Sequence, residues 1–473
     1  MAAQLRPKVG LLGLTLELYE TLAPSLRGRR EQWLRRDILP ALANAGVDVI
    51  FDRAVFKREE IDSAVARFET AGADAILVIL LTYSPSQLAL PALKRTRLPI
   101  LVWNTQELYA VDAAFTSQAM IDNHGVHGTQ DLANVLLRSG VKFRYVTSHV
   151  RDEGAMDVLR DFFIAAAVAR KVRSARLGLL GYPFPGMGDF ALDTTQLVAT
   201  LGCQWTALSV EEYVRRAADA SPKAVTALVA EYRDAYAVAP DVTEADLDAT
   251  ARVEIALRTM AAGRGLDALT YQFTAFGEDE RTPTVPFVAA SRMMADGIGF
   301  GGEGDLVSAI GTAMLNWLCP PASFAEMFTI DFAGNAVFMS HMGEANVAMA
   351  RKDRKVALAA RPTPITRTRQ RQLALVTTFE PGLATFFALT QSCPHGSHWN
   401  FITAPAVIED YGPLDMDVPH FKMKVGDDVR RFLTAYAKAG GPHHCAVCFG
   451  EASRRIRDLA EILGGEYRPC TSD

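Results

Sequence analysis

The sequence predicts an α/β protein with two doubly wound α/β domains, one N-terminal and one central, and a C-terminal antiparallel, β-rich, barrel-like domain. Three observations lead to this prediction: strand and helix patterns alternate over the first third of the chain, the alternation restarts after residue 172, and hairpin signals replace it after residue 322. Alternating helices and continuous apolar strands are typical of a parallel sheet covered on both faces. We therefore expect domains at residues 1–172, 173–322 and 323–473.

The N-terminal domain is predicted from short apolar segments separated by helical patterns. Strands are expected at residues 8–14, 47–51, 75–80 and 99–103, and helices at residues 30–45 and 58–71. Apolar residues at every third or fourth position mark the helices, whereas short apolar runs mark the strands. The segment 75–80 is apolar throughout, which indicates a strand that is buried on both faces.

The central domain repeats this order. A helix is expected at residues 157–171, a strand at 175–180, mostly helical structure over 210–258 and a strand at 268–273. A Gly- and Pro-rich loop, residues 181–188, follows the first of these strands. Ligands bind beside the carboxyl ends of strands in open parallel sheets, so this loop is a candidate for part of a binding site.

The last third of the chain has the signals of antiparallel strands. One hairpin is expected at residues 328–341, around Ala333-Gly334-Asn335, and a second at residues 373–389, turning at Glu380-Pro381-Gly382. Further strands are expected at residues 399–408 and 420–425, with helices at residues 427–439 and 452–463.

Composition limits the classes of function. The formal net charge is −5 and the Arg-rich stretch at 367–371 is short, so we expect no nucleic-acid partner. The longest apolar run, residues 75–81, is far shorter than the roughly 20 residues of a membrane helix, so we expect no membrane partner. Six cysteines scattered over 473 residues do not make a disulfide framework, which favours the reducing cytoplasm.

Two carboxylates are candidates for metal binding. Glu303 lies in the glycine-rich segment GIGFGGEGD, before a helix in which Leu306, Ile310 and Met314 share a face. The helix dipole favours any acidic residue at a helix start, so Glu303 taken alone is more simply an ordinary N-terminal carboxylate. Glu326 lies in PASFAEM, between that helix and the first hairpin, and taken alone it is only a loop glutamate.

Three histidines extend the candidate set. His341 ends a predicted strand, where a lone histidine is more often structural than a ligand. His443 and His444 follow a Gly-Gly-Pro turn at the start of a short apolar strand, so their imidazoles are expected on opposite faces, with one able to enter a site. Two carboxylates with one or two imidazoles suit Mn²⁺, Co²⁺ or Mg²⁺, but spacing alone does not show that they converge. Cys445 and Cys448 form a single C-x-x-C motif, which we interpret as structural thiols rather than a zinc or redox site.

Longer segments around these residues resemble the L-arabinose isomerase family, within the L-fucose/L-arabinose isomerase group, with this chain as a divergent member. LTYQFTAFGED and ASRMMADGIGFGGEGD are similar to the run into the family's first metal-binding glutamate, PASFAEMFTIDF to the segment with the second, FMSHMGEA to the strand with the first histidine, and GGPHHCAVCF to a histidine pair whose second member is a ligand. The resemblance implies the metal ligands Glu303, Glu326, His341 and His444. It also implies that Glu303 and Glu326 are catalytic.

Other segments resemble the family's sugar-contacting residues. The resemblance places Tyr83 of LLTYSPSQ, His127 of DNHGVHGTQ, Met187 of GYPFPGMGDF and Phe276 among these contacts. Two positions depart from the family pattern, since Leu16 and His124 each replace a glutamine. The implied metal set is complete while the sugar contacts are changed, which leaves the identity of the sugar open.

For function, the resemblance implies a metal-dependent aldose–ketose sugar isomerase, with Mn²⁺ as the expected cation and Co²⁺ or Mg²⁺ as alternatives. Proton transfer through an enediolate is the expected chemistry. The resemblance also implies a homotrimer or homohexamer, in which residues of the N-terminal domain reach the active site of a neighbouring subunit. Two other interpretations stay open: a sugar-binding or regulatory protein without turnover, and an epimerase or isomerase of a sugar acid or modified sugar.

Overall fold

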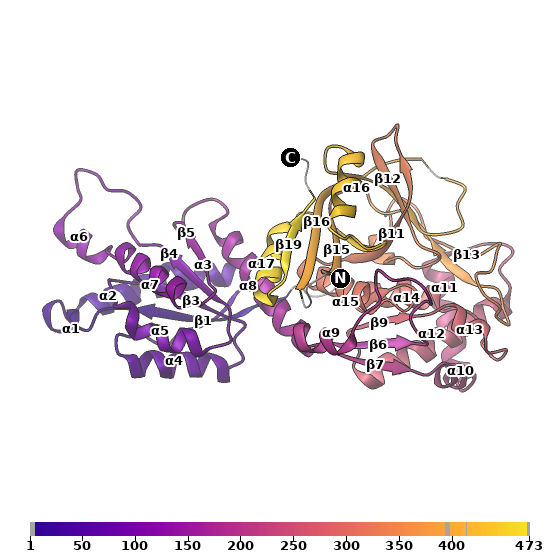
Figure 1. The fold of residues 1–473 in the computed structure, drawn as a ribbon, viewed down its shortest axis with the longest axis horizontal. Coiled ribbons are helices and arrows are strands. Elements are labelled where there is room, and N and C mark those ends of the chain that lie inside the picture. Colours follow the sequence, from indigo (N-terminus) through magenta and orange to yellow (C-terminus); the bar gives the residue numbers. More distant parts are fainter. Residues whose placement is uncertain (1–4, 393–397, 413, 471–473) are drawn as a thin grey trace. The chain divides into compact units, whose positions relative to one another are not determined.

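The computed structural model describes residues 5–392, 398–412 and 414–470, and the chain folds into two compact units. The first unit comprises residues 5–170, drawn in indigo and violet in Figure 1, and the second comprises the described residues from 171 onward. The first unit ends close to the predicted domain boundary at residue 172. The second contains the residues on both sides of 322, so a domain boundary there stays a prediction.

The first unit is built on a parallel sheet in the order β2-β1-β3-β4-β5. Its strands are β1 (Lys8–Leu14), β2 (Asp48–Ile50), β3 (Ala75–Leu80), β4 (Ile100–Asn104) and β5 (Arg144–Thr147). Every residue of β3 is buried, as expected for the central strand of a covered sheet. The predicted strands are confirmed, whereas β5 was not predicted because its sequence, RYVT, has no continuous apolar run.

Helices connect the strands of this first unit, and the last helix, α8, continues past residue 170 into the second unit. They are α1 (Tyr19–Leu22), α2 (Leu26–Trp33), the π-helical turn η1 (Leu34–Ile38), α3 (Leu39–Asn44), α4 (Arg58–Thr70), α5 (Ser86–Arg95), α6 (Ser117–Asp122), α7 (Val126–Arg138) and α8 (Ala155–Ser174). The helix predicted at residues 30–45 is confirmed, although helical structure begins earlier, at Leu26.

The second unit contains another parallel sheet, in the order β10-β9-β6-β7. Its strands are β6 (Arg176–Leu180), β7 (Gln204–Leu208), β9 (Ala268–Tyr271) and β10 (Gly299–Gly301), and its helices are α9 (Thr194–Leu201), α10 (Val210–Ala218), α11 (Pro222–Ala235), α12 (Glu244–Arg264), α13 (Thr274–Gly277), α14 (Phe287–Ala295) and α15 (Leu306–Leu318). The chain passes from β6 to β7 on one side and returns to β9 on the other. This strand order creates a switch point at the carboxyl end of β6, the usual place for a ligand in such a sheet.

A closed antiparallel barrel follows in the same unit, and Figure 1 shows its strands in orange and yellow. The ring runs β15-β18-β11-β12-β17-β16, and pairing between β15 and β16 closes it. The ring strands are β11 (Ala322–Asp331), β12 (Ala336–Ser340), β15 (Gly382–Ser392), β16 (His398–Ile408), β17 (His420–Val425) and β18 (His444–Phe449). A further strand, β19 (Glu466–Pro469), pairs with β16. The helices of this part of the chain are η2 (Val347–Met349), α16 (Val429–Lys438) and α17 (Ser453–Leu463). The predicted barrel-like character of this part of the chain is therefore confirmed.

The two predicted hairpins have different outcomes. The hairpin at residues 328–341 is confirmed as β11 and β12, with β11 starting earlier, at Ala322. The hairpin predicted at residues 373–389 is wrong: β14 (Leu373–Val376) pairs with β13 (Ala357–Ala360) in a small sheet with β8 (Ala237–Val238), whereas β15 belongs to the barrel. A turn signal specifies a local change of direction but not the partner of each strand, and here the segment between β14 and β15 passes from one sheet to another.

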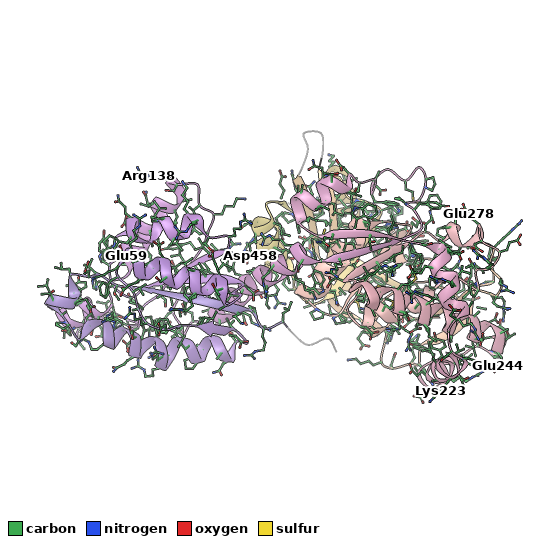
Figure 2. The ribbon with its side chains drawn as sticks, turned by 90° about the horizontal axis from the view of Figure 1, so that it is seen from below. Glu59, Arg138, Lys223, Glu244, Glu278 and Asp458 are labelled. Carbon is green, nitrogen blue, oxygen red and sulfur yellow. The ribbon has the colours of Figure 1, made fainter. Side chains whose placement is uncertain are left out.

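Charged side chains lie at the surface of each unit. Figure 2 labels Glu59 and Arg138 on the first unit and Lys223 and Glu244 on the second, and all four residues are exposed. Within the described ranges, we find no helix with both the length and the apolar character that a membrane crossing requires.

Candidate metal centre

The predicted metal ligands come from two layers of the second unit. Glu303 follows β10 of the parallel sheet, whereas Glu326, His341 and His444 lie on or directly after the barrel strands β11, β12 and β18. In the strand register, Glu326 is opposite His444 on one side and opposite Ser340, the residue before His341, on the other. Strand β11 therefore brings together three side chains that are far apart in the sequence.

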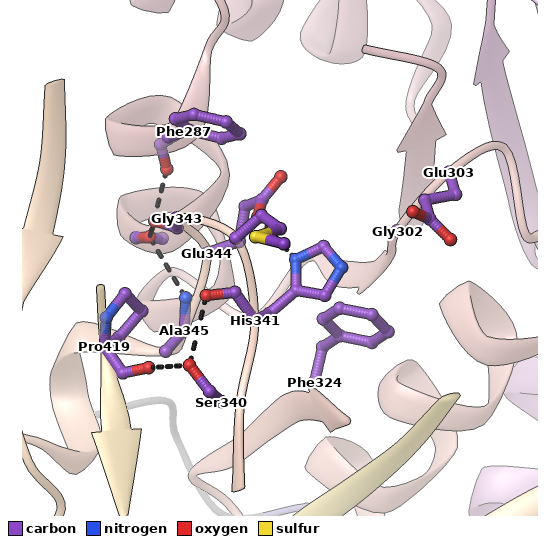
Figure 3. A network of polar contacts seen from close by, with 12 residues as sticks. Phe287, Gly302, Glu303, Phe324, Ser340, His341, Gly343, Glu344, Ala345 and Pro419 are labelled. Carbon is purple, nitrogen blue, oxygen red and sulfur yellow. Dashed lines mark hydrogen bonds and ion pairs between the residues drawn. The ribbon is translucent and has the colours of Figure 1, made fainter. Parts of the chain in front are cut away.

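These side chains are close enough to share one ion. Ligand atoms of Glu326, His341 and His444 all lie within 4.8 Å of one another. Glu303 joins them, since its Oε2 atom is 3.5 Å from Nε2 of His444. Figure 3 shows the His341 ring between Glu344 and Glu303. Atoms that bind one ion at about 2–2.5 Å lie at most about 5 Å apart, so the spacing of Glu326, His341 and His444 fits a single cation, and Glu303 adjoins this group through His444.

Both predicted histidine ligands are oriented by a buried carboxylate. The Nδ1 atom of His341 is 2.6 Å from Oε2 of Glu344, and Nδ1 of His444 is 2.9 Å from Oδ2 of Asp305. These contacts leave Nε2 of each ring for another partner, and Nε2 of His444 is buried with no hydrogen-bond partner among the described residues. A metal-binding histidine almost always has a carboxylate, carbonyl or water on its other nitrogen, so this arrangement fits a metal.

The loop that carries Glu303 is tightly fixed. Glu303 has a φ of +59°, a conformation that is uncommon for residues other than glycine and that costs free energy. Its backbone carbonyl accepts a hydrogen bond from the Phe184 N–H at 2.9 Å, and the Gly304 N–H donates to the Tyr271 carbonyl at 3.1 Å. Asp305 then caps α15, because its Oδ1 accepts hydrogen bonds from the backbone of Val307 and Ser308. The sheet edge and the helix start together hold the Glu303 carboxylate in place.

Substituting Gly302 with alanine is expected to weaken cation binding by tenfold or more. A Cβ atom at this position would lie 2.9 Å from Nε2 of His341 and 3.0 Å from the Phe324 ring, so His341 has to shift. Isothermal titration with Mn²⁺ measures the effect. Gly188→Ala is the matched control, because no atom of the described residues lies within 4 Å of a Cβ at that glycine. Equal Mn²⁺ affinities in the two variants would contradict the prediction.

His443 is a member of the site that sequence reasoning did not select. Its ring centroid is 4.0 Å from that of His444, and its Nε2 atom is also 3.5 Å from Oε2 of Glu303. The predicted placement of the two imidazoles on opposite faces is therefore wrong. The reason is that β18 starts at His444, so strand alternation does not extend to His443. Glu303, His443 and His444 form a second group whose ligand atoms lie within 4.8 Å of one another.

Charge pairing dominates the electrostatics of this group. Burial would raise the pKa of the Glu303 carboxyl, but contacts with His443 and His444 outweigh burial and lower that pKa to about 2. Burial would lower the pKa of the His443 imidazole, but Asp189 and Glu303 outweigh burial and raise that pKa to about 10. Without a cation the glutamate is therefore a carboxylate at neutral pH and His443 is positively charged.

Met187 and Phe276, the two sugar contacts predicted in the second unit, have different surroundings in the structure. Met187 lies half-buried in the loop after β6, and its neighbour Phe190 stacks on the His444 ring at 5.6 Å. Phe276 is fully buried in the core, where its ring packs on Tyr213 and Tyr271. This position makes Phe276 a core residue that offers no exposed surface, and its predicted contact with sugar gains no support from the structure.

The predicted sugar contacts of the first unit gather at the carboxyl edge of its sheet. Tyr83 stacks on His127, with ring centroids 5.1 Å apart. Tyr19 shares a hydrogen bond of 2.8 Å with Nε2 of His124, whose Nδ1 meets the Ile121 carbonyl. Leu16, directly after β1, is half-buried. Both ring nitrogens of His124 are therefore engaged within the protein.

We expect Leu16 and His124 to set the choice of sugar. A glutamine at each position would offer the sugar an amide group, which Leu16 does not carry and which His124, with both ring nitrogens engaged, does not replace; an unmatched polar partner costs about 1–3 kcal/mol. The combined substitutions Leu16→Gln and His124→Gln should raise kcat/KM for L-arabinose relative to other aldoses by roughly tenfold or more. The measurement is kcat/KM over a panel of sugars for wild type and the double variant. An unchanged order of preference would remove both positions from the specificity site.

The cysteines of the C-x-x-C motif are buried side chains of β18. The thiol of Cys445 donates to the Ala325 carbonyl, and burial raises its pKa well above the ordinary value. In the part of the chain that the structure describes, the groups able to hold a metal contain only glutamates and histidines. The interpretation of these cysteines as structural thiols agrees with their surroundings.

Comparison with known proteins gives a consistent result. The model of the L-arabinose isomerase central domain matches residues 191–319, and the model of the L-arabinose isomerase C-terminal domain matches residues 321–466. Together the two matches cover more than half of the chain and include all four predicted metal ligands. The segments that match the two family models thus contain most of the parallel sheet of the second unit and the barrel, which together provide the residues of the metal centre.

Individual relatives extend over most of the chain. An L-arabinose isomerase from Acidothermus cellulolyticus is 28% identical over 458 residues, which are 91% of this chain and 87% of the relative. An L-arabinose isomerase from a Nocardioides species is 27% identical over 399 residues, 81% of this chain and 78% of the relative. A solved periplasmic solute-binding protein from Actinobacillus succinogenes with bound D-allose is 14% identical in sequence, and the match covers 66% of this chain and 92% of the binding protein's chain. Its TM-score is 0.18, which gives no support to a binding-protein fold. The family models and these relatives agree, and the chain belongs to the L-arabinose isomerase family.

Proposed function

We propose that this protein is a divalent-metal-dependent isomerase that interconverts an aldose and a ketose. The observation that carries the proposal is the group Glu326, His341 and His444, whose ligand atoms lie within 4.8 Å of one another, with each histidine oriented by a buried carboxylate. Relatives named L-arabinose isomerase over most of the chain support the aldose–ketose reaction class.

The chain supplies two carboxylates for the chemistry. Moving a carbonyl between the first two carbons of a sugar requires a proton to leave one carbon and return to the other. We assign the acceptance and return of that proton to Glu303 and Glu326, and a general base of this kind contributes about 10²–10⁴-fold to the rate. The bound cation would act as a Lewis acid on the sugar oxygens, an effect worth several kcal/mol.

The donor set indicates which cation to expect. Two carboxylates and two imidazoles offer mixed oxygen and nitrogen ligands, which suit Mn²⁺ best, with Co²⁺ or Mg²⁺ as alternatives. The absence of any cysteine from the group among the described residues disfavours a soft metal. A cytoplasmic location and a homotrimer or homohexamer with shared active sites belong to the same proposal.

A panel of aldoses and ketoses incubated with Mn²⁺ tests the proposed function. Product formation from at least one aldose, with the matching ketose converted in reverse, is the expected result. Sugar binding without any product would instead favour a binding or regulatory protein. Inversion at a single carbon without carbonyl migration would identify an epimerase.

A further inference from the structure

The Arg-rich stretch at residues 367–371 belongs to a basic loop that the proposed reaction has not used. This basic loop spans residues 361–371, between β13 and β14, and it contains four arginines and no acidic residue. Arg371 pairs with Asp241 and Asp246. Among the described residues, no carboxylate pairs with the other three arginines, which are Arg361, Arg367 and Arg369. Because the whole chain has a formal net charge of −5, the loop is a local excess of positive charge in an acidic protein.

The basic loop is held against the carboxyl edge of the parallel sheet in the second unit, the edge that carries Glu303. It touches α13, the helix that directly follows β9: a Cβ atom on Gly277 would lie 3.2 Å from the backbone nitrogen of Arg367. The buried Gln372 fastens the loop from inside. Its Oε1 accepts a hydrogen bond from the Ile365 N–H at 3.1 Å, and its Nε2 donates to the Thr366 carbonyl at 2.9 Å. The arginines are therefore presented from a backbone that is fixed at the ligand-binding edge of the sheet.

Arg361, at the start of the basic loop, lies close to the metal centre. Its Nη1 atom donates a hydrogen bond to the carbonyl of Met342, the residue directly after the predicted ligand His341. Since consecutive Cα atoms are about 3.8 Å apart, this contact places the guanidinium on the order of 10 Å from the His341 ring. A hexose held at the ion through its first two oxygens is long enough to bring its far end to such a cation.

Two of the three guanidinium nitrogens of Arg361 have no oxygen acceptor in the described part of the chain. Nε is buried without a hydrogen-bond partner, and Nη2 has the sulfur of Met342, a weak acceptor, at 3.9 Å. Nε and Nη2 together form one edge of the guanidinium, which binds a carboxylate or phosphate through two parallel hydrogen bonds. The side chain beside this edge is a methionine that is 38% exposed, an adaptable residue that a ligand can move.

The acidic residues nearby do not supply the missing counter-charge. Glu303 contacts His443 and His444, and at the end of α13 Glu278 accepts a hydrogen bond from Tyr182 at 2.8 Å. Asp279 pairs with Arg281, and Glu280 is exposed and makes no ion pair with the basic loop in the described structure. A partly buried cation is normally paired, so a ligand is left to bring the negative charge.

We propose that the substrate is an anionic sugar, an aldose with a carboxylate or phosphate group at the end remote from the reacting carbons, and that Arg361 binds this group through Nε and Nη2. The exposed Arg367 and Arg369 add positive potential that attracts the anion to this edge of the sheet. A neutral aldose would leave the guanidinium edge of Arg361 without an acceptor. This inference rests on the proposed function and names its substrate class, while the cation and the proton transfer stay as proposed.

Compounds that cannot isomerise test the anion site without turnover. Isothermal titration of the full-length, Mn²⁺-loaded protein measures the Kd of three compounds with one carbon skeleton: glucitol, glucitol 6-phosphate and gulonate, the acid made by reducing the aldehyde of glucuronate. The galacto counterparts of all three are measured as well. In parallel, kcat/KM is measured for glucose, glucose 6-phosphate and glucuronate and for the matching galactose series. Glucitol and the free aldoses are neutral, and the two anions distinguish a phosphate site from a carboxylate site.

Four variants accompany the wild type: Arg361→Gln, Arg361→Lys, Arg367→Gln and the control Arg138→Gln. Arg138 is also an exposed arginine without an ion pair among the described residues, but it lies at the end of α7 in the first unit. Arg361→Lys keeps the positive charge and loses the two-pronged geometry. Arg367→Gln changes only an exposed side chain, so it reports the charge of the loop even if Arg361 also supports the fold.

We expect the wild type to bind one of the anions roughly tenfold or more tighter than the neutral alditol, and to convert the matching anionic aldose with the higher kcat/KM. Arg361→Gln should weaken binding of that anion by roughly tenfold to a hundredfold, with the Kd of glucitol and of Mn²⁺ within threefold of wild type. Arg361→Lys should be intermediate, Arg367→Gln should weaken anion binding by about threefold, and Arg138→Gln should match wild type. Added salt should weaken binding of the anion and leave binding of the alditol unchanged. A purely structural role of Arg361 would instead weaken the neutral and the anionic compounds alike.

The results that overturn this inference differ from those that overturn the isomerase. Rapid conversion of neutral aldoses, with no gain in kcat/KM or Kd for either anion, would refute the anionic substrate and leave the isomerase in place. Equal losses for glucitol and the anions in Arg361→Gln, or no detectable binding of any anion by the wild type, would also refute it. Anion binding that depends on Arg361, in a protein that converts no sugar of the panel, would retain the anion site and refute the proposed function.

Discussion

Replacing Glu326 with glutamine is expected to leave a folded protein whose kcat falls by roughly 10²–10⁴-fold, the usual contribution of a general base. Glutamine is nearly isosteric with glutamate, so the pairing of β11 with β12 and β18 is retained. The substitution removes a negative charge that faces His341 and His444, and it removes a proton acceptor. Weaker cation binding adds to the loss unless Mn²⁺ is saturating.

The measurement is kcat at saturating Mn²⁺, with circular dichroism and thermal unfolding to confirm the fold. Glu211→Gln is the matched control, because this glutamate is exposed and pairs with Arg281 on the surface. A surface pair of this kind contributes about 0–1 kcal/mol to stability and nothing to the chemistry. If Glu326→Gln turns over within threefold of wild type, Glu326 is not part of the catalytic site and the centre lacks its second carboxylate.

The fold could be predicted from the sequence wherever local pattern decides structure. Buried parallel strands such as β3 are continuous apolar runs, and that pattern is local. Antiparallel pairing is not local, since a strand can pair with any edge that its apolar face fits. The Glu380-Pro381-Gly382 turn therefore predicts a hairpin that does not form, since β14 pairs with β13 and β15 pairs with β16 and β18.

The candidate site likewise contains features that local sequence pattern predicts and features that depend on the tertiary fold. Each predicted ligand lies in a segment with a recognisable pattern, but their convergence depends on the register of β11 between β12 and β18. Glu344 and Asp189 carry no local signal, because each is an ordinary acidic residue until folding brings a histidine to it. Asp305 caps α15 through one carboxylate oxygen, and its second oxygen contacts His444 only because of the tertiary fold.

Removal of divalent cations is expected to abolish turnover, and Mn²⁺ or Co²⁺ should restore it. Glu303 and Glu326 bring negative charge to two imidazoles whose Nδ1 atoms are already engaged, so the centre is arranged for a positive ion. Without that ion, the sugar carbonyl lacks the Lewis acid on which the proposed reaction depends. The assay uses chelated, dialysed protein, with residual metal measured by elemental analysis.

A second readout of cation binding does not depend on activity. A ligand that binds only the folded state stabilises it by RT ln(1 + [L]/Kd), which is about 2.7 kcal/mol at a hundredfold excess over Kd. Mn²⁺ should therefore raise the Tm of the wild-type protein, and the rise should be much smaller in Glu326→Gln, which lacks one charged ligand, but unchanged in Glu211→Gln. Full turnover by protein that is verified as metal-free would refute metal dependence. A Tm rise of equal size in Glu326→Gln would show that the stabilising cation binds away from Glu326, because removing a charged ligand must weaken binding at its own site.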